Sequence, residues 1–306
     1  MINLQPYLVF KAETTRLNSL YWTSKYSYKR IAGLLKLMAD TGPNPAADPR
    51  VDQLWGAAEL GQSSIATRPL SEFINTLDAD AAALRTTSIL QVCSAFENAL
   101  SGYFILCVLY QPLKYDPAYT GDCVPTLLRK PQLYEARKKV IKTLSDDELR
   151  GQYTKRLKMI VTTWRLPALT APGLTRINGY YKKRHLIAHD QGLGAVDSPE
   201  SSAREAMASA ITIDEKTWKS MLDDFNTILK ELDERVAKHV VTDFGISLAM
   251  HRVISRDGPQ LLTELKHKIS TEWRTGNVSK STAVAVAKAI GLQIKQVDGN
   301  KFQLFR

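Results

Sequence analysis

The chain has 306 residues, of which 44% are hydrophobic, 24% charged and 8% aromatic. These values are typical of globular proteins and argue against wholesale disorder or a fibrous repeat. Three cysteines, none in a C-x-x-C pair, argue against a disulfide framework and a zinc finger. The chain starts with no basic-then-apolar signal sequence and has no run of about 18 uncharged apolar residues, so we expect a cytoplasmic protein that contacts no membrane.

The positive charge of the chain is concentrated in one segment. The net charge is +10, and residues 129–184 hold 15 basic and 4 acidic side chains. Such a segment is commonly a solvated helix face. The alternative is a surface that follows the phosphate backbone of RNA. On that alternative, the candidate RNA-binding residues are Lys138, Lys139, Lys142, Lys182 and Lys183.

Residues 1–80 are predicted to form a helical N-terminal extension. Spaced apolar residues predict a helix over 14–39. A cluster of glycine, proline and asparagine after it predicts a loop over 41–50. A second helix, rich in small and polar residues, is predicted at about 70–84.

The strongest helix signal covers residues 84–110. Apolar residues recur there at alternating spacings of four and three, which places them on one face of a helix. They are Ile89, Cys93, Phe96, Leu100, Tyr103 and Cys107. Further helices are predicted over 131–144, 146–164 and 174–189, separated by proline and glycine.

The last helix of this region is predicted to begin at a capping box. Thr212 and Glu215 have the spacing in which each side chain satisfies a backbone N–H of the first turn. The apolar positions that follow are Trp218, Leu222, Phe225, Leu229, Leu232 and Val236. Together these elements predict a helical bundle over residues 81–240.

The C-terminal segment, residues 241–306, has a different pattern. Apolar spacing predicts one helix near Leu265 and a second over 280–290. Two alternating runs, Gln293–Val297 and Lys301–Phe305, flank an Asp-Gly-Asn turn and predict a hairpin. This order predicts a small winged-helix-like α+β module. The predicted fold class is therefore all-α, a bundle with a helical N-terminal extension and this module.

One short motif of the chain carries chemistry. At the end of a predicted helix, Arg184 is followed by the polar residue His185, then by a few mostly apolar residues, and then by His189. This pattern resembles the signature of the HEPN superfamily of helical ribonucleases. The segment around Glu97 is similar to the acidic first core helix of that family, and the capped helix is similar to its closing helix. The resemblance covers residues 84–240.

The resemblance implies a metal-independent endoribonuclease that uses no cofactor, acting as a toxin or in phage defence. Cleavage of RNA without a metal requires the 2′-hydroxyl to lose a proton and the 5′-oxygen to gain one. An imidazole can do either at neutral pH, so His189 is the candidate acid or base, with His185 beside it. Arg184 is the candidate for stabilising the charge on the phosphate. Glu97 is the candidate for orienting these side chains.

Helix geometry constrains this site. Residues five apart on a helix differ by about 140° around its axis. Arg184 and His189 therefore point at one phosphate only if the helix ends between them or a second chain completes the site. The resemblance implies the second arrangement, a face-to-face homodimer. A toxin or defence protein of this family would also have an antitoxin or another defence protein as a partner.

Each candidate residue has a structural alternative. Arg184 is also a favourable cation near a helix C-terminus, and His189 is also a capping residue. His185 and His189, one turn apart, are spaced as zinc ligands, but no third ligand is evident. Glu97 is also an ordinary polar flank of a core helix.

The alternative function belongs to another class of protein. It is a non-catalytic helical adaptor or nucleic-acid-binding protein in which the arginine–histidine pair is degenerate. Tyr180 and Tyr181, just before the motif, are either core residues or a platform on which bases stack.

Overall fold

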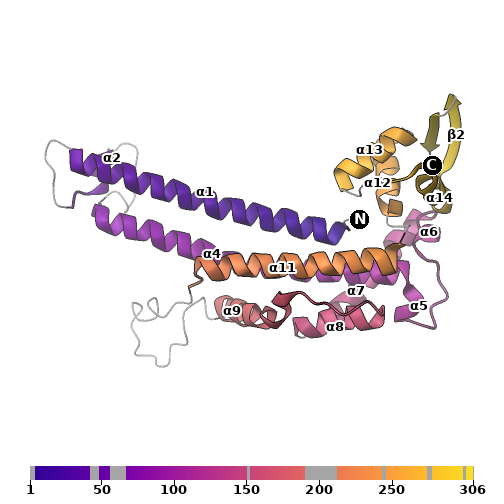
Figure 1. The fold of residues 1–306 in the computed structure, drawn as a ribbon, viewed down its shortest axis with the longest axis horizontal. Coiled ribbons are helices and arrows are strands. Elements are labelled where there is room, and N and C mark those ends of the chain that lie inside the picture. Colours follow the sequence, from indigo (N-terminus) through magenta and orange to yellow (C-terminus); the bar gives the residue numbers. More distant parts are fainter. Residues whose placement is uncertain are drawn as a thin grey trace. The chain divides into compact units, whose positions relative to one another are not determined.

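The computed structural model describes residues 4–41, 48–55, 67–149, 152–189, 212–242, 246–273, 278–298 and 301–305. Helices dominate this part of the chain, and a small antiparallel sheet lies near the C-terminus (Figure 1), so the mostly helical class with a C-terminal hairpin is confirmed. The elements in chain order are α1 (Gln5–Thr41), α2 (Val51–Trp55), α4 (Leu70–Tyr110), α5 (Pro112–Tyr115), α6 (Val124–Leu127), α7 (Pro131–Glu148), α8 (Tyr153–Thr163), the 3-10 turn η1 (Pro172–Thr175), α9 (Ile177–His189), α11 (Glu215–Val236), the π-helical turn η2 (Ala237–Val241), α12 (Ser247–Asp257), β1 (Gln260–Leu261), α13 (Leu262–Trp273), α14 (Lys280–Ala289), β2 (Gln293–Asp298) and β3 (Lys301–Phe305).

The chain forms two compact units. The first consists of Met1–Ala12, Ser94–Gly179 and Met221–Arg306, and the second consists of Glu13–Cys93 and Tyr180–Ser220. Long helices such as α4 therefore contribute residues to both units. The division of the chain into three domains at residues 80 and 240 stays a prediction.

Helix α4 is longer than the sequence pattern predicts. The two helices predicted over 70–84 and 84–110 are one uninterrupted helix, so the predicted boundary at 84 is wrong. Alanines occupy positions 81–83, and alanine is the strongest helix former. The apolar stripe predicted from Ile89 to Cys107 is confirmed, because all six of its side chains are fully buried.

Helix α4 is also long and apolar enough, by composition alone, to cross a membrane. Of its most apolar 18-residue window, 56% is buried inside the protein. It is the one such helix among the residues that the structure describes. The absence of membrane contact stays a prediction.

The boundaries of the next helices lie later than predicted. Helix α7 continues to Glu148, and α8 begins only at Tyr153. The predicted helix over 174–189 begins as the 3-10 turn η1 and becomes α-helical at Ile177. The predicted loop after His189 lies outside the described residues, as does most of the breaker cluster after Thr41.

The core of the second unit joins the end of α1, the short helix α2 and the start of α4. Leu35, Val51, Leu70, Phe73 and Leu77 form one buried apolar cluster. Figure 1 shows these three helices side by side. The helical character predicted for the N-terminal extension is confirmed, but α1 begins at Gln5 and not at the predicted residue 14.

The start of α11 is capped differently from the prediction. Asp214 is the capping residue, because one carboxylate oxygen accepts the backbone N–H of Thr217 at 2.7 Å and the other accepts its hydroxyl at 2.9 Å. Glu215 instead accepts hydrogen bonds from Tyr21 at 3.1 Å and from Lys25, both on α1. The predicted capping box is wrong because the glutamate is used by a tertiary contact.

The core of the first unit is built on aromatic packing between α4 and α11. The rings of Phe96 and Phe225 stack with centroids 4.6 Å apart, and Phe10 of α1 meets Phe96 edge-on at 6.4 Å. Such pairs add attraction beyond the burial of apolar area. The apolar stripe predicted for α11 is confirmed, although Leu222 is only half-buried.

A buried carboxylate fastens the N-terminal end of α1 to this core. Asp233 of α11 is 2% exposed. It accepts the backbone N–H of Leu4 at 3.1 Å and the hydroxyl of Tyr103 at 2.7 Å. Burial raises the pKa of Asp233 to about 7, although these hydrogen bonds act in the opposite direction.

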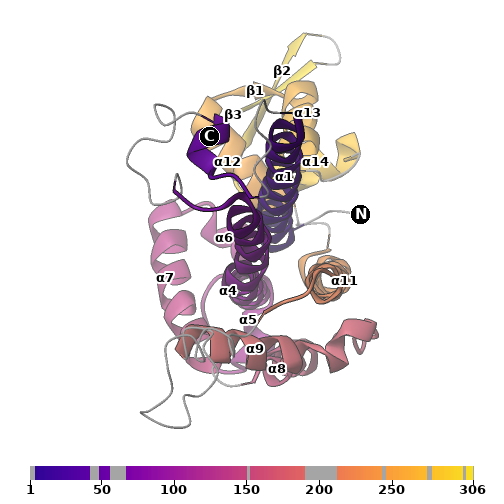
Figure 2. The same ribbon diagram turned by 90° about the vertical axis from the view of Figure 1, so that its left-hand side faces the viewer.

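The C-terminal elements surround a three-stranded antiparallel sheet in the order β1-β3-β2. Figures 1 and 2 both show α13 and α14 beside this sheet. The two predicted helices and the hairpin are confirmed. Strand β1 was not predicted, because a strand of two residues is too short to show an alternating pattern. Residues 274–277 and 299–300, for which the sequence predicts turns, lie outside the described residues.

We predict that Asp233→Asn changes the pH dependence of stability. The raised pKa means that the folded state holds the proton over pH values where the unfolded state has lost it. The contribution of Asp233 to the free energy of unfolding is therefore fully present below about pH 4 and is lost as the pH rises to about 7. The effect is about 1.4 kcal/mol for each unit of pKa shift.

Urea denaturation of both proteins between pH 4 and pH 8 measures this difference. We expect the wild-type stability to fall relative to that of the variant across this range. Asparagine keeps an oxygen that accepts from Leu4 and Tyr103, so the variant is expected to fold. Parallel pH profiles would contradict the assignment of the raised pKa to Asp233.

Candidate active site

The start of α9 is held by an ion pair between a buried carboxylate and an exposed arginine, which no sequence pattern predicted. Asp224 of α11 is 5% exposed. The guanidinium of Arg176 donates to both of its oxygens, with distances of 2.7 Å and 2.5 Å. Gly173 of η1 lies so close to Asp224 that an added Cβ would come within 2.6 Å of the aspartate Cβ. In the sequence, the one signal of this close approach is that Gly173 follows a proline.

One face of α9 is packed into the protein. Ile177, Tyr180, Tyr181 and Ile187 are buried, and they follow helical spacing. The hydroxyl of Tyr181 donates to the main-chain carbonyl of Cys93 on α4 at 3.1 Å. The two tyrosines are therefore core residues, and the base-stacking alternative is wrong for them.

Arg184 lies on the same stripe of α9 as these buried residues. It comes three residues after Tyr181 and three before Ile187, and its side chain is half-buried. His185, the next residue, is exposed. The helix thus presents the arginine and His185 in different directions.

Helix α9 continues without a break from Arg184 to His189, its last residue. The side chain of His189 lies outside the description. Of the two arrangements considered for the site, the one in which the helix ends between these residues is therefore wrong. About 140° of rotation separates their positions on one chain.

Glu97 is positioned by a neighbour on another helix. It is half-buried on α4, and its carboxylate accepts the hydroxyl of Tyr153 on α8 at 2.5 Å. The guanidinium of Arg156 lies over the Tyr153 ring, 4.3 Å from its centroid. Glu97 is thus part of a hydrogen-bonded cluster. Its predicted role in orienting Arg184 or His189 stays a prediction.

The predicted RNA-binding lysines differ in exposure. Lys139 and Lys142 on α7 and Lys182 on α9 are exposed. Lys183 is half-buried. Lys138 is half-buried too, lies 4.0 Å from Glu135, and lines a pocket of the first unit. The exposed lysines have the accessibility that a phosphate backbone requires.

A cluster of aromatic and cationic side chains in the second unit was also missed. Trp22 stacks on Tyr26, which is 64% exposed, with centroids 5.7 Å apart. The amines of Lys25 and Lys219 lie 5.1 Å and 4.8 Å from the centroid of Trp22. An exposed ring beside cations is typical of surfaces that stack bases, although both lysines also pair with Glu215. The sequence signal that could have found this cluster is the spacing of Trp22 and Tyr26, which is one helical turn.

Metal-ligating side chains do not gather in the described part of the chain. No group of three or more His, Cys, Asp or Glu residues there is close enough to hold a metal ion. Cys93 and Cys107 are buried among apolar residues, and burial raises the pKa of Cys107 far above its ordinary value. These two are core residues, as their position on an apolar helix face predicts. The same prediction for Cys123 is wrong, because that cysteine is exposed.

A scan against models of protein families found no match to this chain, and searches of curated proteins and of solved structures found none either.

We predict that Gly173→Ala destabilises the protein by roughly 1–3 kcal/mol, the typical cost of overpacking a filled site. The added methyl would meet the side chain and, at 3.0 Å, the backbone of Asp224, which α11 holds in place. Gly179→Ala, in α9, is the matched control, because nothing lies within 4 Å of its added Cβ. The control should be stabilised by about 0.4–1 kcal/mol. Thermal or urea denaturation gives both values, and equal stabilities would refute the close approach.

Proposed function

We propose that this chain is a HEPN-like, metal-independent endoribonuclease whose active residues lie on α9. The observation that carries the proposal is the placement of Arg184 on the packed stripe of that helix. A charged side chain is rarely found at a position where helical spacing calls for an apolar one. Positions that break such a local rule are commonly functional.

The residues of α9 supply the chemistry that RNA cleavage needs. A guanidinium is always charged and stabilises the charge that gathers on the phosphate. The imidazoles of His185 and His189 move protons between the 2′-hydroxyl, the 5′-oxygen and water at neutral pH. Glu97, held by Tyr153, is proposed to orient one of these groups.

A second copy of the chain is proposed to complete the site. Because α9 is unbroken, Arg184 and His189 of one chain leave the helix in directions about 140° apart. In a two-fold dimer, Arg184 of one protomer faces His189 of the other. Two-fold symmetry is the commonest form of protein assembly.

The route of the RNA is proposed to follow the basic segment. Lys139 and Lys142 are exposed one helical turn apart on α7, and Lys182 is exposed beside the motif. Lysines arranged in this way hold phosphates without reading bases. The stacked pair Trp22 and Tyr26 is proposed to hold bases.

The C-terminal elements are proposed to be a winged-helix-like module. Helix α12, the sheet order β1-β3-β2 and the hairpin support this assignment. Helix α14 would be its reading helix, yet Ala283, Val286 and Ala287 are buried and its polar groups are few. We propose that the module docks a partner protein, such as one that restrains a toxin, and does not read nucleic acid.

We predict that Arg184→Ala and His189→Ala each abolish RNA cleavage. Purified protein is incubated with total RNA in EDTA, and new fragments should end in 2′,3′-cyclic phosphate. His267→Ala is the control, because this histidine is exposed on α13, away from the motif in sequence. Circular dichroism checks that each variant is folded. RNA that stays intact but bound in the wild type would favour the adaptor function instead.

We predict that the two inactive variants restore cleavage when mixed. After exchange of subunits, half of the dimers are mixed, and each mixed dimer holds one site with an intact Arg184 and an intact His189. The expected activity is about one quarter of wild type, from random pairing in a two-fold dimer. A mixture as inactive as its components, with dimers formed, would rule out a site shared between chains.

A further inference from the structure

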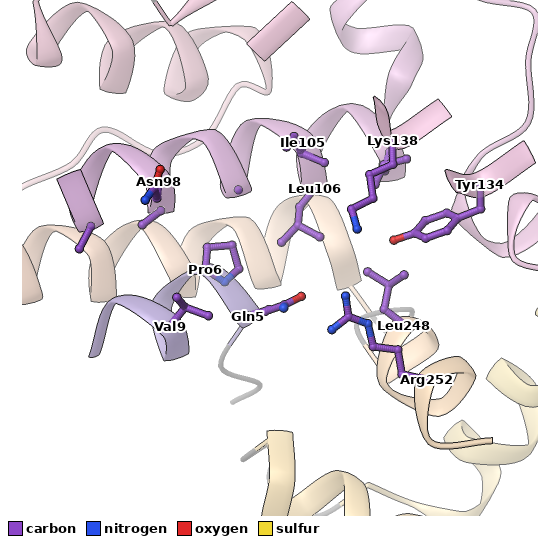
Figure 3. Close-up of a pocket in the computed structure, with 14 residues that line it drawn as sticks. Gln5, Pro6, Val9, Asn98, Ile105, Leu106, Tyr134, Lys138, Leu248 and Arg252 are labelled. Carbon is purple, nitrogen blue, oxygen red and sulfur yellow. The ribbon is translucent and has the colours of Figure 1, made fainter. Parts of the chain in front are cut away.

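A pocket of about 250 Å³ lies in the first unit, and its lining includes Lys138, one of the candidate RNA-binding lysines. Its walls come from four elements, namely the first turns of α1, the C-terminal part of α4, α7 and α12. Figure 3 shows the side chains that point into it. The pocket has an apolar part and a polar part.

The apolar part is formed by Pro6 and Val9 of α1 and by Leu106 of α4 (Figure 3). Val9 is 52% exposed, so an apolar surface is left uncovered at the pocket. Gly102 of α4 lies against Pro6, where an added Cβ would come within 2.9 Å of the proline ring. This close approach of α1 and α4 closes one wall of the pocket.

The polar part is a convergence of hydrogen-bond donors. Figure 3 shows the amine of Lys138, the hydroxyl of Tyr134 and the guanidinium of Arg252 pointing toward one another, with the amide of Gln5 beside them. None of the residues that line the pocket is acidic. The carboxylate of Glu135, which is not part of the lining, lies 4.0 Å from the Lys138 amine.

A lysine and an arginine that point toward one another next to an apolar surface attract an anion to the space between them. Lysine supplies three N–H donors and arginine five, and neither accepts a hydrogen bond. The tyrosine hydroxyl adds one more donor. Burial raises the pKa of Tyr134, so its hydroxyl keeps its proton for donation, although the charge of Arg252 acts in the opposite direction.

We propose that this pocket binds a small anionic amphiphile, a molecule with a carboxylate or phosphate head and a short apolar tail. The head lies between Lys138, Tyr134 and Arg252, and the tail covers Val9 and Leu106. The volume is equal to about eight water-sized groups of roughly 30 Å³ each, which suits a chain of about eight carbons. The proposal does not depend on ribonuclease activity.

Bound ligand would join α1 and α12 through α4 and α7, because each of these elements lines the pocket. Any ligand that binds the folded state alone raises the stability of that state. Octanoate should therefore raise the unfolding temperature of the full chain as its concentration increases.

Titration calorimetry of the full-length protein with octanoate and octyl phosphate tests the proposal. We expect saturable one-to-one binding of at least one of them, and the tighter one identifies the head group. Octanol lacks the charge, octylamine reverses it and acetate lacks the tail, so each should bind at least about tenfold more weakly. Equal binding of octanol or octylamine would overturn recognition by the cations, and equal binding of acetate would overturn the apolar part.

Substitutions locate the binding on the pocket. Lys138→Met should weaken octanoate binding at least about tenfold. Lys139→Met, on the same helix but outside the lining, is the matched control and should bind as the wild type does. Leu106→Trp should block the tail without changing the charge. Equal losses in the two lysine variants, or full binding by the Leu106→Trp protein, would overturn the proposal. If a variant fails to fold, the ligand series on the wild type still decides.

Discussion

The apolar stripe of α4 is the packing surface on which the described core depends. Within the first unit, Phe96 contacts both Phe10 of α1 and Phe225 of α11. Within the second unit, the carbonyl of Cys93 on the same helix receives the hydroxyl of Tyr181 from α9. Truncating one large buried side chain typically costs about 3–5 kcal/mol, a large fraction of the stability of a domain. The position of the candidate active helix is thus tied to this stripe.

Two buried carboxylates of α11 add directional contacts to this apolar packing. Asp224 receives Arg176 from the start of α9, and Asp233 receives Tyr103 of α4 together with the backbone of Leu4. A buried carboxylate is costly unless it is hydrogen-bonded, so alternative packings that separate these partners are disfavoured. The two contacts hold the residues that immediately precede α1 and α9, and so position the start of each helix. Apolar side chains alone have no comparable directional preference.

Much of the candidate site was accessible from the sequence, but its geometry was not. The order of Arg184, His185 and His189 on one helix follows from residues close together in the chain. Which of them lies on the packed face depends on where Tyr181 and Ile187 are buried, and this requires the neighbouring helix. The unbroken course of α9 excludes the arrangement in which the helix ends between Arg184 and His189. The assignment of the motif to the HEPN superfamily rests on the resemblance.

The sequence by itself determined the helical class, the buried faces of α4 and α11 and the C-terminal hairpin, because periodicity and turn residues act over a few neighbouring positions. It did not determine the cap of α11, because Glu215 is used by Tyr21 and Lys25 of α1 and Asp214 takes its place. Strand β1, the ion pair of Arg176 with Asp224 and the pocket were likewise decided by tertiary structure. Their parts lie tens to hundreds of residues apart in the chain. Such groups meet only when helices pack, and no local pattern records which donor will face which acceptor.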